Sequence, residues 1–490
     1  MLIRYVGHAS LSIEVAGQRV LTDPWWNGPA YTGQWYHYPL PRVERSDIDN
    51  ADFIYISHGH EDHLHIPTLR TISKNASLVI PRFRNPGMRD CLASLGFRRI
   101  LEIGHGQKRR LAPGLDATVY INKDDSILVL EGDGRTLIDA NDALHASPRH
   151  VIDHFCAQIR TRHPRIDTLF IGYGGASWFP NCIQPSDSPS FDARRREQVF
   201  AQNFAYIARQ LDPRMVFPFA ATFVLLEDHL RWINAVRFRM GSPCDELRRQ
   251  GAYDIVSHHL MPGDRILGDQ ILTGVQGPPS AEEAEAEIRS LFATKHAEIS
   301  RRKEMEEERI QRVLEHLLSN ASNRHRRVFG VGQRIQCRID LRDLPEVSFM
   351  VDARRGRIRI DLCDRLRLAP MILTTRLDVL EAWVTQDYGY ESISIGYGAV
   401  LQLRHRDIPL HMPLLNLLGC RPLPPTGTER LAMWLHHPWR CFDTWRRNLH
   451  LQWLAWRMRK GDVQCWNDMY SFDQDRWSPL REEPLNRASA

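Results

Sequence analysis

His58-Gly-His60-Glu-Asp62-His63 follows directly on the apolar run Phe53-Ile-Tyr-Ile-Ser57. A strand end holds the backbone still while the loop after it turns several side chains toward one point. His58 and His60, two positions apart, predict donors for one metal ion, and Asp62 and His63 then face a second. Imidazole and carboxylate donors suit zinc, iron or manganese. The alternative, an exposed histidine-rich loop without metal, is disfavoured because histidine is rare and this spacing seldom arises by chance.

Length and composition narrow the class of protein. The chain has 490 residues, 43% hydrophobic and 25% charged, which is ordinary globular composition for about three domains. A net charge of +5, from 64 basic and 59 acidic residues, is too small to indicate a nucleic-acid partner. The apolar runs are too short to span a membrane, and the strand-like start does not read as a leader peptide. Nine cysteines without a Cys-x-x-Cys pair indicate reduced thiols. We therefore expect a cytoplasmic protein with a small-molecule substrate.

Four segments are expected along the chain. Residues 1–275 alternate short β-type runs with turns and predict a sheet-rich α/β domain. Residues 276–325 are polar with a one-sided apolar pattern and predict a connecting helix. Residues 326–410 predict a smaller α+β domain, and residues 411–490 a helical tail that is rich in tryptophan. The strands expected most clearly are residues 10–15, 19–22, 53–57, 126–130, 136–139, 334–340, 347–352 and 358–362.

The tail contains a stripe formed by Trp445, Leu449, Trp453 and Trp456, which are spaced for one face of a helix. A basic amphipathic helix with tryptophans can lie on a membrane surface. Such a stripe is more often buried, so docking on the body or on another copy in a homo-oligomer is favoured.

Several motifs together resemble the metallo-β-lactamase superfamily, in its branch near ascorbate-phosphate lactonase. They are the His58–His63 run, Gly7-His-Ala-Ser10, and Asp23 in Leu21-Thr-Asp-Pro24. A longer resemblance is to the CMP-N-acetylneuraminate hydroxylase family, carried by residues 131–142, 174–177, 217–220 and 393–397. It implies an αββα sandwich of two mixed sheets with the metal site at one edge. It also implies that Asp142 bridges two metals and that Asp23 orients a ligand histidine.

Two departures from the family pattern concern the remaining ligands. Where the family has a third histidine, this chain has Asn122-Lys-Asp-Asp125, which contains no imidazole. Asp124, Asp125 and His105 could substitute, but a surface turn is the favoured role for each. The closing histidine expected after Ala220 is also missing, and either Glu227 or His229 is expected to supply that donor.

Three functions remain open from the sequence. The favoured one is a hydrolase in which two metal ions, expected to be zinc, activate water against an ester, lactone or phosphoester, with His60, Asp62 and Asp142 as catalytic residues. The second, with iron, is an oxygen-dependent hydroxylase. The resembling hydroxylase also carries a Rieske domain, but this sequence has neither a Cys-x-His nor a Cys-x-x-His pair, so electrons would come from a separate protein or from the substrate itself. The third is a binding protein with a decayed metal site.

Overall fold

The computed structural model divides into two compact units. It describes residues 1–174, 182–185, 193–230, 233–234, 242–274, 283, 286–290, 293, 306–330, 332–386, 389–421, 423 and 425–457. Unit 1 comprises the described residues within 1–176, 197–306 and 421–463, and unit 2 those within 177–196 and 307–420. The start of the expected connecting helix and part of the resembling segment 174–177 lie outside the described residues.

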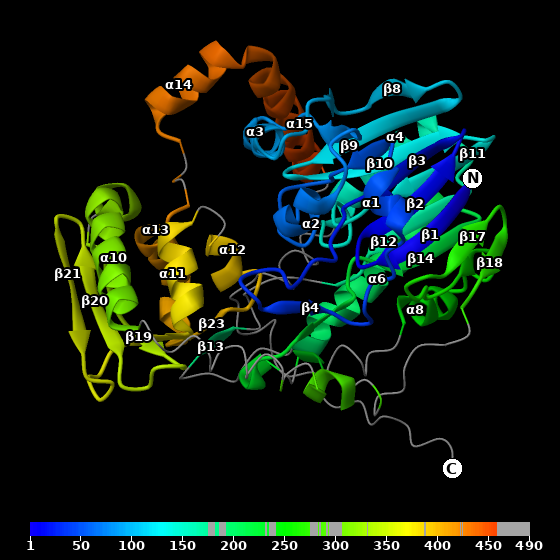
Figure 1. The fold of residues 1–490 in the computed structure, drawn as a ribbon. Coiled ribbons are helices and arrows are strands. Elements are labelled where there is room, and N and C mark those ends of the chain that lie inside the picture. The colour runs from blue at the N-terminus through cyan, green and yellow to red at the C-terminus, as the bar shows by residue number, and fades with distance from the viewer. Residues whose placement is uncertain are drawn as a thin grey trace. The chain divides into compact units, whose positions relative to one another are not determined.

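Unit 1 is built on two mixed β-sheets (Figure 1). The eight-stranded sheet has the order β18(Gln270–Leu272), β17(Arg265–Leu267), β1(Leu2–Gly7), β2(Ser10–Val15), β3(Gln18–Thr22), β5(Phe53–Tyr55), β6(Ser77–Pro81) and β7(Ile100–Ile103). The seven-stranded sheet has the order β16(Val256–Ser257), β14(Met215–Phe219), β12(Thr168–Gly172), β11(Arg135–Asp139), β10(Asp125–Gly132), β9(Leu115–Asn122) and β8(Gln107–Ala112).

Three apolar cores define the layers of unit 1. The first lies between the sheets and joins side chains such as Leu11 and Ile13 of β2 to Leu128 and Leu130 of β10. The second covers the other face of the seven-stranded sheet with α4(Arg149–Arg162) and α6(Ala193–Leu211), and the third covers the eight-stranded sheet with α2(Ile66–Thr71) and α3(Gly87–Ser94). Successive side chains of a strand point to opposite faces of its sheet. Each strand can therefore contribute to the core between the sheets and to the core on the outer face of its own sheet. The expected αββα sandwich is confirmed.

The expected strands form where the alternation is clearest. β2 has the predicted bounds, and β3, β10 and β11 each extend the predicted run by one to three residues. β5 is shorter than expected and ends at Tyr55, because the chain leaves the sheet to form the loop that carries the histidines. Smaller elements of the sandwich are α1(Arg45–Asp49), α8(Pro243–Arg249), the 3-10 helix η1(Asp228–Leu230) and the β4(Trp35–His37)–β15(Phe223–Leu225) pair.

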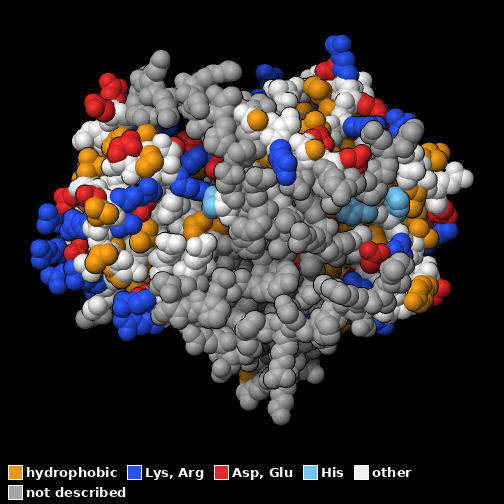
Figure 2. Space-filling view, turned by 90° about the horizontal axis from the view of Figure 1, so that it is seen from below, with side chains coloured by type: hydrophobic (Ala, Val, Ile, Leu, Met, Phe, Trp, Pro, Cys, Tyr) orange, Lys and Arg blue, Asp and Glu red, His pale blue; other side chains and the backbone are white. Residues whose placement is uncertain are grey.

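Unit 2 is an α+β structure around a six-stranded sheet. Its order is β13(Ile183–Pro185), β23(Ala399–Leu403), β22(Met371–Thr375), β19(Arg334–Leu341), β20(Ser348–Arg354) and β21(Arg357–Cys363). Its helices are α10(Glu306–Val328), α11(Leu377–Thr385), α12(Gly389–Ile393), η3(His405–Leu410) and α13(His411–Leu418). The Asn320 side chain of α10 donates to backbone carbonyls of α11 and α13, so this helix belongs to unit 2. The side chains of Arg354, Arg355 and Arg357 are exposed. Figure 2 shows Lys and Arg side chains gathered at the left edge of the view.

Two helices of the tail, α14(Gly427–His436) and α15(Pro438–Arg457), belong to unit 1. Arg440 of α15 forms an ion pair with Glu102 of β7 at 2.6 Å, and Arg447 donates to the carbonyl of Ile121 at 3.0 Å. The helix therefore docks on the body through the side that carries Arg440 and Arg447. The tryptophan stripe does not, because its side chains are 43 to 60% exposed. Within the described residues, no helix combines the length and hydropathy needed to cross a bilayer.

Candidate metal centre

Parallel strand pairing brings the candidate residues to one edge of the eight-stranded sheet. β3 and β5 are parallel neighbours with Thr22 opposite Tyr55, so the residues that follow these two strands leave the sheet side by side. Asp23 follows β3, and its backbone amide donates to the carbonyl of Tyr55. A turn closed by the amides of His63 and Leu64 on the carbonyl of His60 then folds the histidine loop back on itself.

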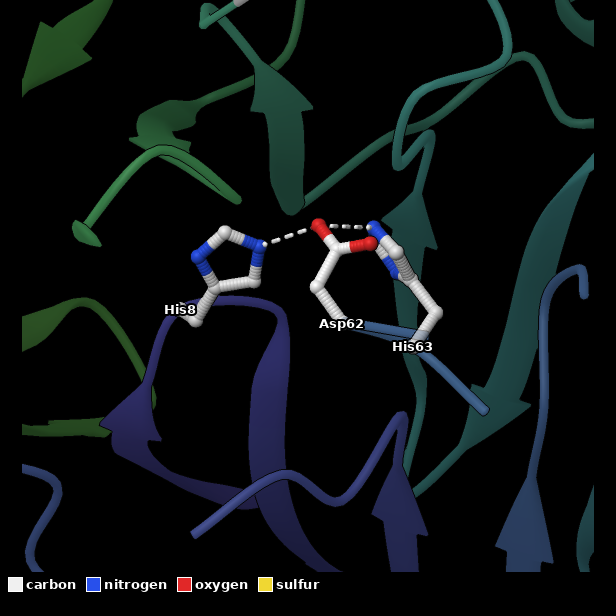
Figure 3. A group of neighbouring side chains, drawn as sticks. All are labelled: His8, Asp62 and His63. Carbon is white, nitrogen blue, oxygen red and sulfur yellow. Dashed lines mark hydrogen bonds and ion pairs between the residues drawn. The ribbon is translucent and has the colours of Figure 1, made fainter. Parts of the chain in front are cut away.

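Potential ligand atoms converge in three overlapping groups. In each, one ligand atom per residue lies within 4.8 Å of the others. The groups are His8, Asp62 and His63; His58, His60 and Asp125; and His58, His63 and Asp142. The first is drawn in Figure 3, where the Asp62 carboxylate lies between the two imidazoles. Five of these residues were expected from the sequence, and His8 and Asp125 complete the groups.

Asp23 holds His63 in one orientation. Its Oδ2 lies 2.9 Å from His63 Nδ1, and both side chains are fully buried. A carboxylate only accepts hydrogen bonds, so Nδ1 carries a proton and Nε2 is the nitrogen that faces the centre. That Nε2 lies 3.4 Å from Asp62 Oδ2 and 3.6 Å from Asp142 Oδ2. The orienting role that the resemblance implies for Asp23 therefore fits this geometry.

Ser57 fixes the imidazole of His58 in a similar way. The Ser57 hydroxyl donates to Asp23 Oδ2 at 2.6 Å and lies 2.9 Å from His58 Nδ1. Because the single hydroxyl proton goes to Asp23, His58 Nδ1 must donate to the Ser57 oxygen. The Nε2 atom of His58 is left as the donor to a metal. Tyr31 donates its hydroxyl proton to Asp62 Oδ1 and leaves Oδ2 facing the two imidazoles.

Asp125 lies where the expected third histidine is missing. Its Oδ1 is 3.6 Å from His58 Nε2, so its side chain faces the centre and the favoured reading of a surface turn is wrong. The other two candidates have structural contacts: His105 Nδ1 accepts the amide of Ile121, and Asp124 belongs to none of the three groups. Asn122 is buried and donates to the carbonyl of Ala143.

Asp142 follows β11 and belongs to the third group. Gly172, at the end of the parallel strand β12, donates its amide to the carbonyl of Asn141 at 3.0 Å. A Cβ atom on Gly172 would lie 2.8 Å from both that carbonyl oxygen and Asp142 Oδ1. Real Cβ atoms essentially never approach so closely, so only glycine allows this turn to lie against β12.

We expect Gly172→Ala to displace the Asn141–Asp142 turn and weaken metal binding by about 10-fold or more. Forcing a methyl group into a packed site typically costs about 1–3 kcal/mol. Isothermal titration with Zn²⁺ or Fe²⁺ measures the affinity. Gly427→Ala, in α14, is the control, because a Cβ on Gly427 meets nothing within 4 Å. Equal metal affinity in the two variants would contradict this packing argument.

His8 is the donor that the sequence argument missed. It belongs to the Gly7-His-Ala-Ser10 stretch, which was used for the resemblance but given no ligand role. Its Nε2 lies 3.0 Å from Asp62 Oδ2 and its side chain is fully buried. The backbone at His8 has φ of 51°, in the left-handed region that few non-glycine residues adopt and that often marks functional sites. The feature of the sequence that could have identified His8 as a donor is its position in the turn between two strands that are both buried.

Glu227 and His229 lie after β15, in and beside η1, and both are partly buried. Neither belongs to the three donor groups found among the described residues. The expectation that one of them completes the site remains a prediction, and the structure offers His8 as a different candidate for that position.

Alanine variants separate these candidates. We expect His8→Ala to lower the metal content per chain, because it removes one imidazole from the group with Asp62 and His63. Glu227→Ala and His229→Ala, the matched controls, are expected to keep full metal content. Elemental analysis of the purified variants, with circular dichroism to verify folding, gives the answer. If metal were lost only in Glu227→Ala or only in His229→Ala, that residue would be the ligand and the assignment of His8 would be contradicted.

The two central imidazoles experience opposite electrostatic influences. Burial, followed by the neighbouring imidazole of His63, lowers the pKa of His58 well below its ordinary value. Burial also lowers the pKa of His63, but the carboxylates of Asp62 and Asp142 outweigh it and raise that pKa well above its ordinary value. The imidazole of His58 therefore favours its neutral form, whereas the surroundings of His63 favour positive charge.

Negative charge is concentrated at the centre. Burial, with the nearby Asp142 carboxylate, raises the pKa of Asp125 to about 6. Asp62, Asp125 and Asp142 form ion pairs with the imidazoles of His8, His58 and His63. Buried carboxylates need a compensating cation, and a divalent metal supplies one.

The donor atoms fit a metal pair. His63 Nε2 and Asp142 Oδ1 are buried and have no hydrogen-bond partner within the part of the chain that the structure describes. Imidazole nitrogens and carboxylate oxygens directed at a common point are the ligands of zinc, iron and manganese sites. Cysteine contributes to none of the groups, which leaves the choice among these metals open.

Comparison with known proteins supports this fold. Residues 2–145 match the family described as the β-lactamase superfamily domain. Over 248 residues the chain is 30% identical to a Mycobacterium tuberculosis protein named as a Rieske 2Fe-2S iron–sulfur protein, a match covering 48% of this chain and 46% of that protein. It is 24% identical over 280 residues to the cytidine monophosphate-N-acetylneuraminic acid hydroxylase of Danio rerio, covering 53% of this chain and 45% of that protein.

A solved structure with a similar fold is CmlA, a diiron β-hydroxylase from Streptomyces venezuelae. The TM-score is 0.37 at 18% identity, and the match covers 54% of this chain and 53% of that one. The chain spans about half the length of the curated relatives that it matches. The matched family covers β1 to β11 and contains the His58–His63 motif and Asp142. Residues 2–145 are therefore similar to the β-lactamase superfamily domain.

Proposed function

We propose that the chain is a dinuclear iron enzyme that hydroxylates a small organic substrate with molecular oxygen. The observation that carries the proposal is the composition of the donor groups. His58, His60 and Asp125 form one set of two imidazoles and a carboxylate, and His8, His63 and Asp62 form another. Two histidines and one carboxylate with open positions are typical of non-haem iron oxygenases.

The choice of a hydroxylase over a hydrolase rests on this donor set and on the relatives. A carboxylate replaces the expected third histidine and shifts the preference toward harder, redox-active metals. The sequence relatives include hydroxylases and proteins named for Rieske iron–sulfur centres. The hydrolase favoured from the sequence becomes the second candidate.

The chain's own residues prepare the donors before any metal binds. Bound iron would supply the redox chemistry that activates oxygen. Asp23 and Ser57 fix the protonated Nδ1 atoms of His63 and His58, so both rings already point Nε2 at the centre and need not rotate. Tyr31 holds one oxygen of Asp62. Asp142 reaches His58 and His63 together and is the candidate for a carboxylate shared by two ions.

Hydroxylation requires an external electron donor. Converting a C–H bond to an alcohol with O2 consumes two electrons and two protons and releases one water. The Cys-x-His and Cys-x-x-His pairs of a Rieske centre are absent from this sequence. We assign the electrons to a separate iron–sulfur protein.

The second candidate, a hydrolase, is favoured by the shared carboxylate at two adjacent donor groups. Two-metal sites of this type activate water and stabilise the leaving oxygen in ester and phosphoester hydrolysis. In this reading zinc occupies the site and no electron donor is needed.

Metal content and oxygen uptake separate these functions. We expect the aerobically purified chain to contain iron, and the anaerobically reconstituted Fe²⁺ form to consume O2 when a chemical reductant is added, whereas the Zn²⁺ form does not. Zinc as isolated, with Zn²⁺-dependent cleavage of model esters, would replace the proposal by the hydrolase. A chain that binds neither metal would indicate a binding protein.

A further inference from the structure

The tail helices α14 and α15, labelled in Figure 1, carry many exposed apolar side chains. We call this set the aromatic face. Its side chains range from 40% exposed at Trp434 to 79% at Trp439, although apolar groups of this size are usually buried. Contiguous apolar surfaces of this kind mark interaction sites. The aromatic face consists of Leu431, Trp434, Leu435, Trp439, Phe442, Trp445, Leu449, Trp453 and Trp456.

The opposite side of α15 is already docked on unit 1. Arg440 donates to the carbonyl of Phe83 as well as to Glu102, and Leu451 packs against the core beneath α4. At about 100° per residue, these positions and Arg447 lie on the side of the helix away from the tryptophans. The body that anchors α15 therefore cannot also cover the aromatic face.

The charge of this segment favours an anionic partner. Residues 421–457 contain six arginines and two acidic residues, Glu429 and Asp443. Arg421, Arg430 and Arg446 are exposed, whereas Arg440 and Arg447 are held on the side that faces the body. Both acids are engaged: Glu429 accepts the Thr426 amide at the start of α14, and Asp443 pairs with Arg446 at 3.6 Å. Two copies meeting through this segment would bring their arginines together, which disfavours self-association.

We propose that the aromatic face docks on a lipid surface that carries anionic headgroups. Five of its nine residues are tryptophans, and this side chain prefers the boundary between acyl chains and headgroups. α15 has 20 residues and is therefore about 30 Å long, enough to lie in the plane of the interface. Exposed arginines beside the apolar stripe then reach the anionic headgroups.

Vesicle flotation of the full chain tests this. The vesicles contain either phosphatidylcholine alone or phosphatidylcholine with about one third phosphatidylglycerol. We expect binding to the anionic vesicles to be about 10-fold tighter or more, and to weaken as salt is added. A shift of tryptophan fluorescence to shorter wavelength should accompany binding.

Matched variants identify the surface. The double variant Leu449→Glu with Trp453→Glu should bind anionic vesicles at least about 10-fold more weakly, because it puts charges into the apolar stripe. Leu267→Glu with Leu272→Glu is the control, since these leucines are 50% and 45% exposed on a different face. Equal metal content and circular dichroism verify that both variants are folded.

Two outcomes would overturn the proposal. One is equal vesicle binding by the aromatic-face variant and its control. The other is a chain that ignores both vesicles but sediments as a dimer that Leu449→Glu with Trp453→Glu dissociates, which would make the aromatic face a contact between copies.

Discussion

Replacing His60 by alanine is expected to weaken metal binding at the His58–His60–Asp125 group by more than about 100-fold. Losing a residue that only orients a ligand costs 10- to 100-fold in affinity, and His60 offers its own ligand atom. The loop remains closed by backbone hydrogen bonds, so the fold should survive. Elemental analysis and competition with a metal-sensitive dye would measure the loss.

His154→Ala is the matched control for this experiment. His154 is also partly buried, but it lies on α4 and belongs to none of the donor groups. Its replacement should leave metal content unchanged. If the His60→Ala protein kept its full metal complement, the assignment of the His58–His63 loop as the metal centre would fail.

Asp23→Asn should lower both the stability of the protein and its affinity for metal. The buried Asp23 carboxylate accepts hydrogen bonds from the backbone and side chain of Ser57, from His63 and from Asn141. An asparagine has one oxygen and presents an NH2 group to at least one of these donors. Each unsatisfied buried group costs about 1–3 kcal/mol, so we expect a loss of roughly 2–5 kcal/mol in the free energy of unfolding.

Denaturant unfolding of metal-free protein measures this loss apart from metal binding. Metal titration should then show a further 10- to 100-fold fall in affinity, because His63 is no longer held in one tautomer. Asp269→Asn is the control, since Asp269 is an exposed residue whose partners are surface arginines, and its stability should be nearly unchanged. Wild-type stability in Asp23→Asn would contradict the hydrogen-bond network.

The sandwich was predictable because its signals are local. Strands such as β2 and β10 show an apolar run bounded by turn residues, and the sequence alone places them within a few positions. The six-residue histidine motif supplies four donors from one loop. Asp142 required the family resemblance, because a carboxylate after a strand is otherwise a common turn residue.

The remaining donors depend on contacts between distant segments. His8 meets Asp62 only because β1 and the β5 loop end at the same edge of the sandwich, across 54 residues of sequence. Asp125 faces His58 because Asn122 and Asp125 pair with each other at the turn of the β9–β10 hairpin. This pairing register cannot be read from the sequence alone. A helical pattern likewise does not show what covers its apolar side. The stripe that includes Trp445 and Trp453 was expected to dock on the body or on another copy, and the body leaves it exposed.

The candidate ligands come from both sheets, so a bound metal ion would link the two sheets to each other. His8 and the His58–His63 loop extend from the eight-stranded sheet, whereas Asp125 and Asp142 belong to strand ends of the seven-stranded sheet. An ion held by both sets is a cross-link through the middle of the sandwich, which separation of the sheets must break. Such an ion at 100 times its dissociation constant would add about 2.7 kcal/mol to the free energy of unfolding. The melting temperature should therefore follow the free metal concentration and fall on chelation, so that iron or zinc supply sets the lifetime of the folded chain.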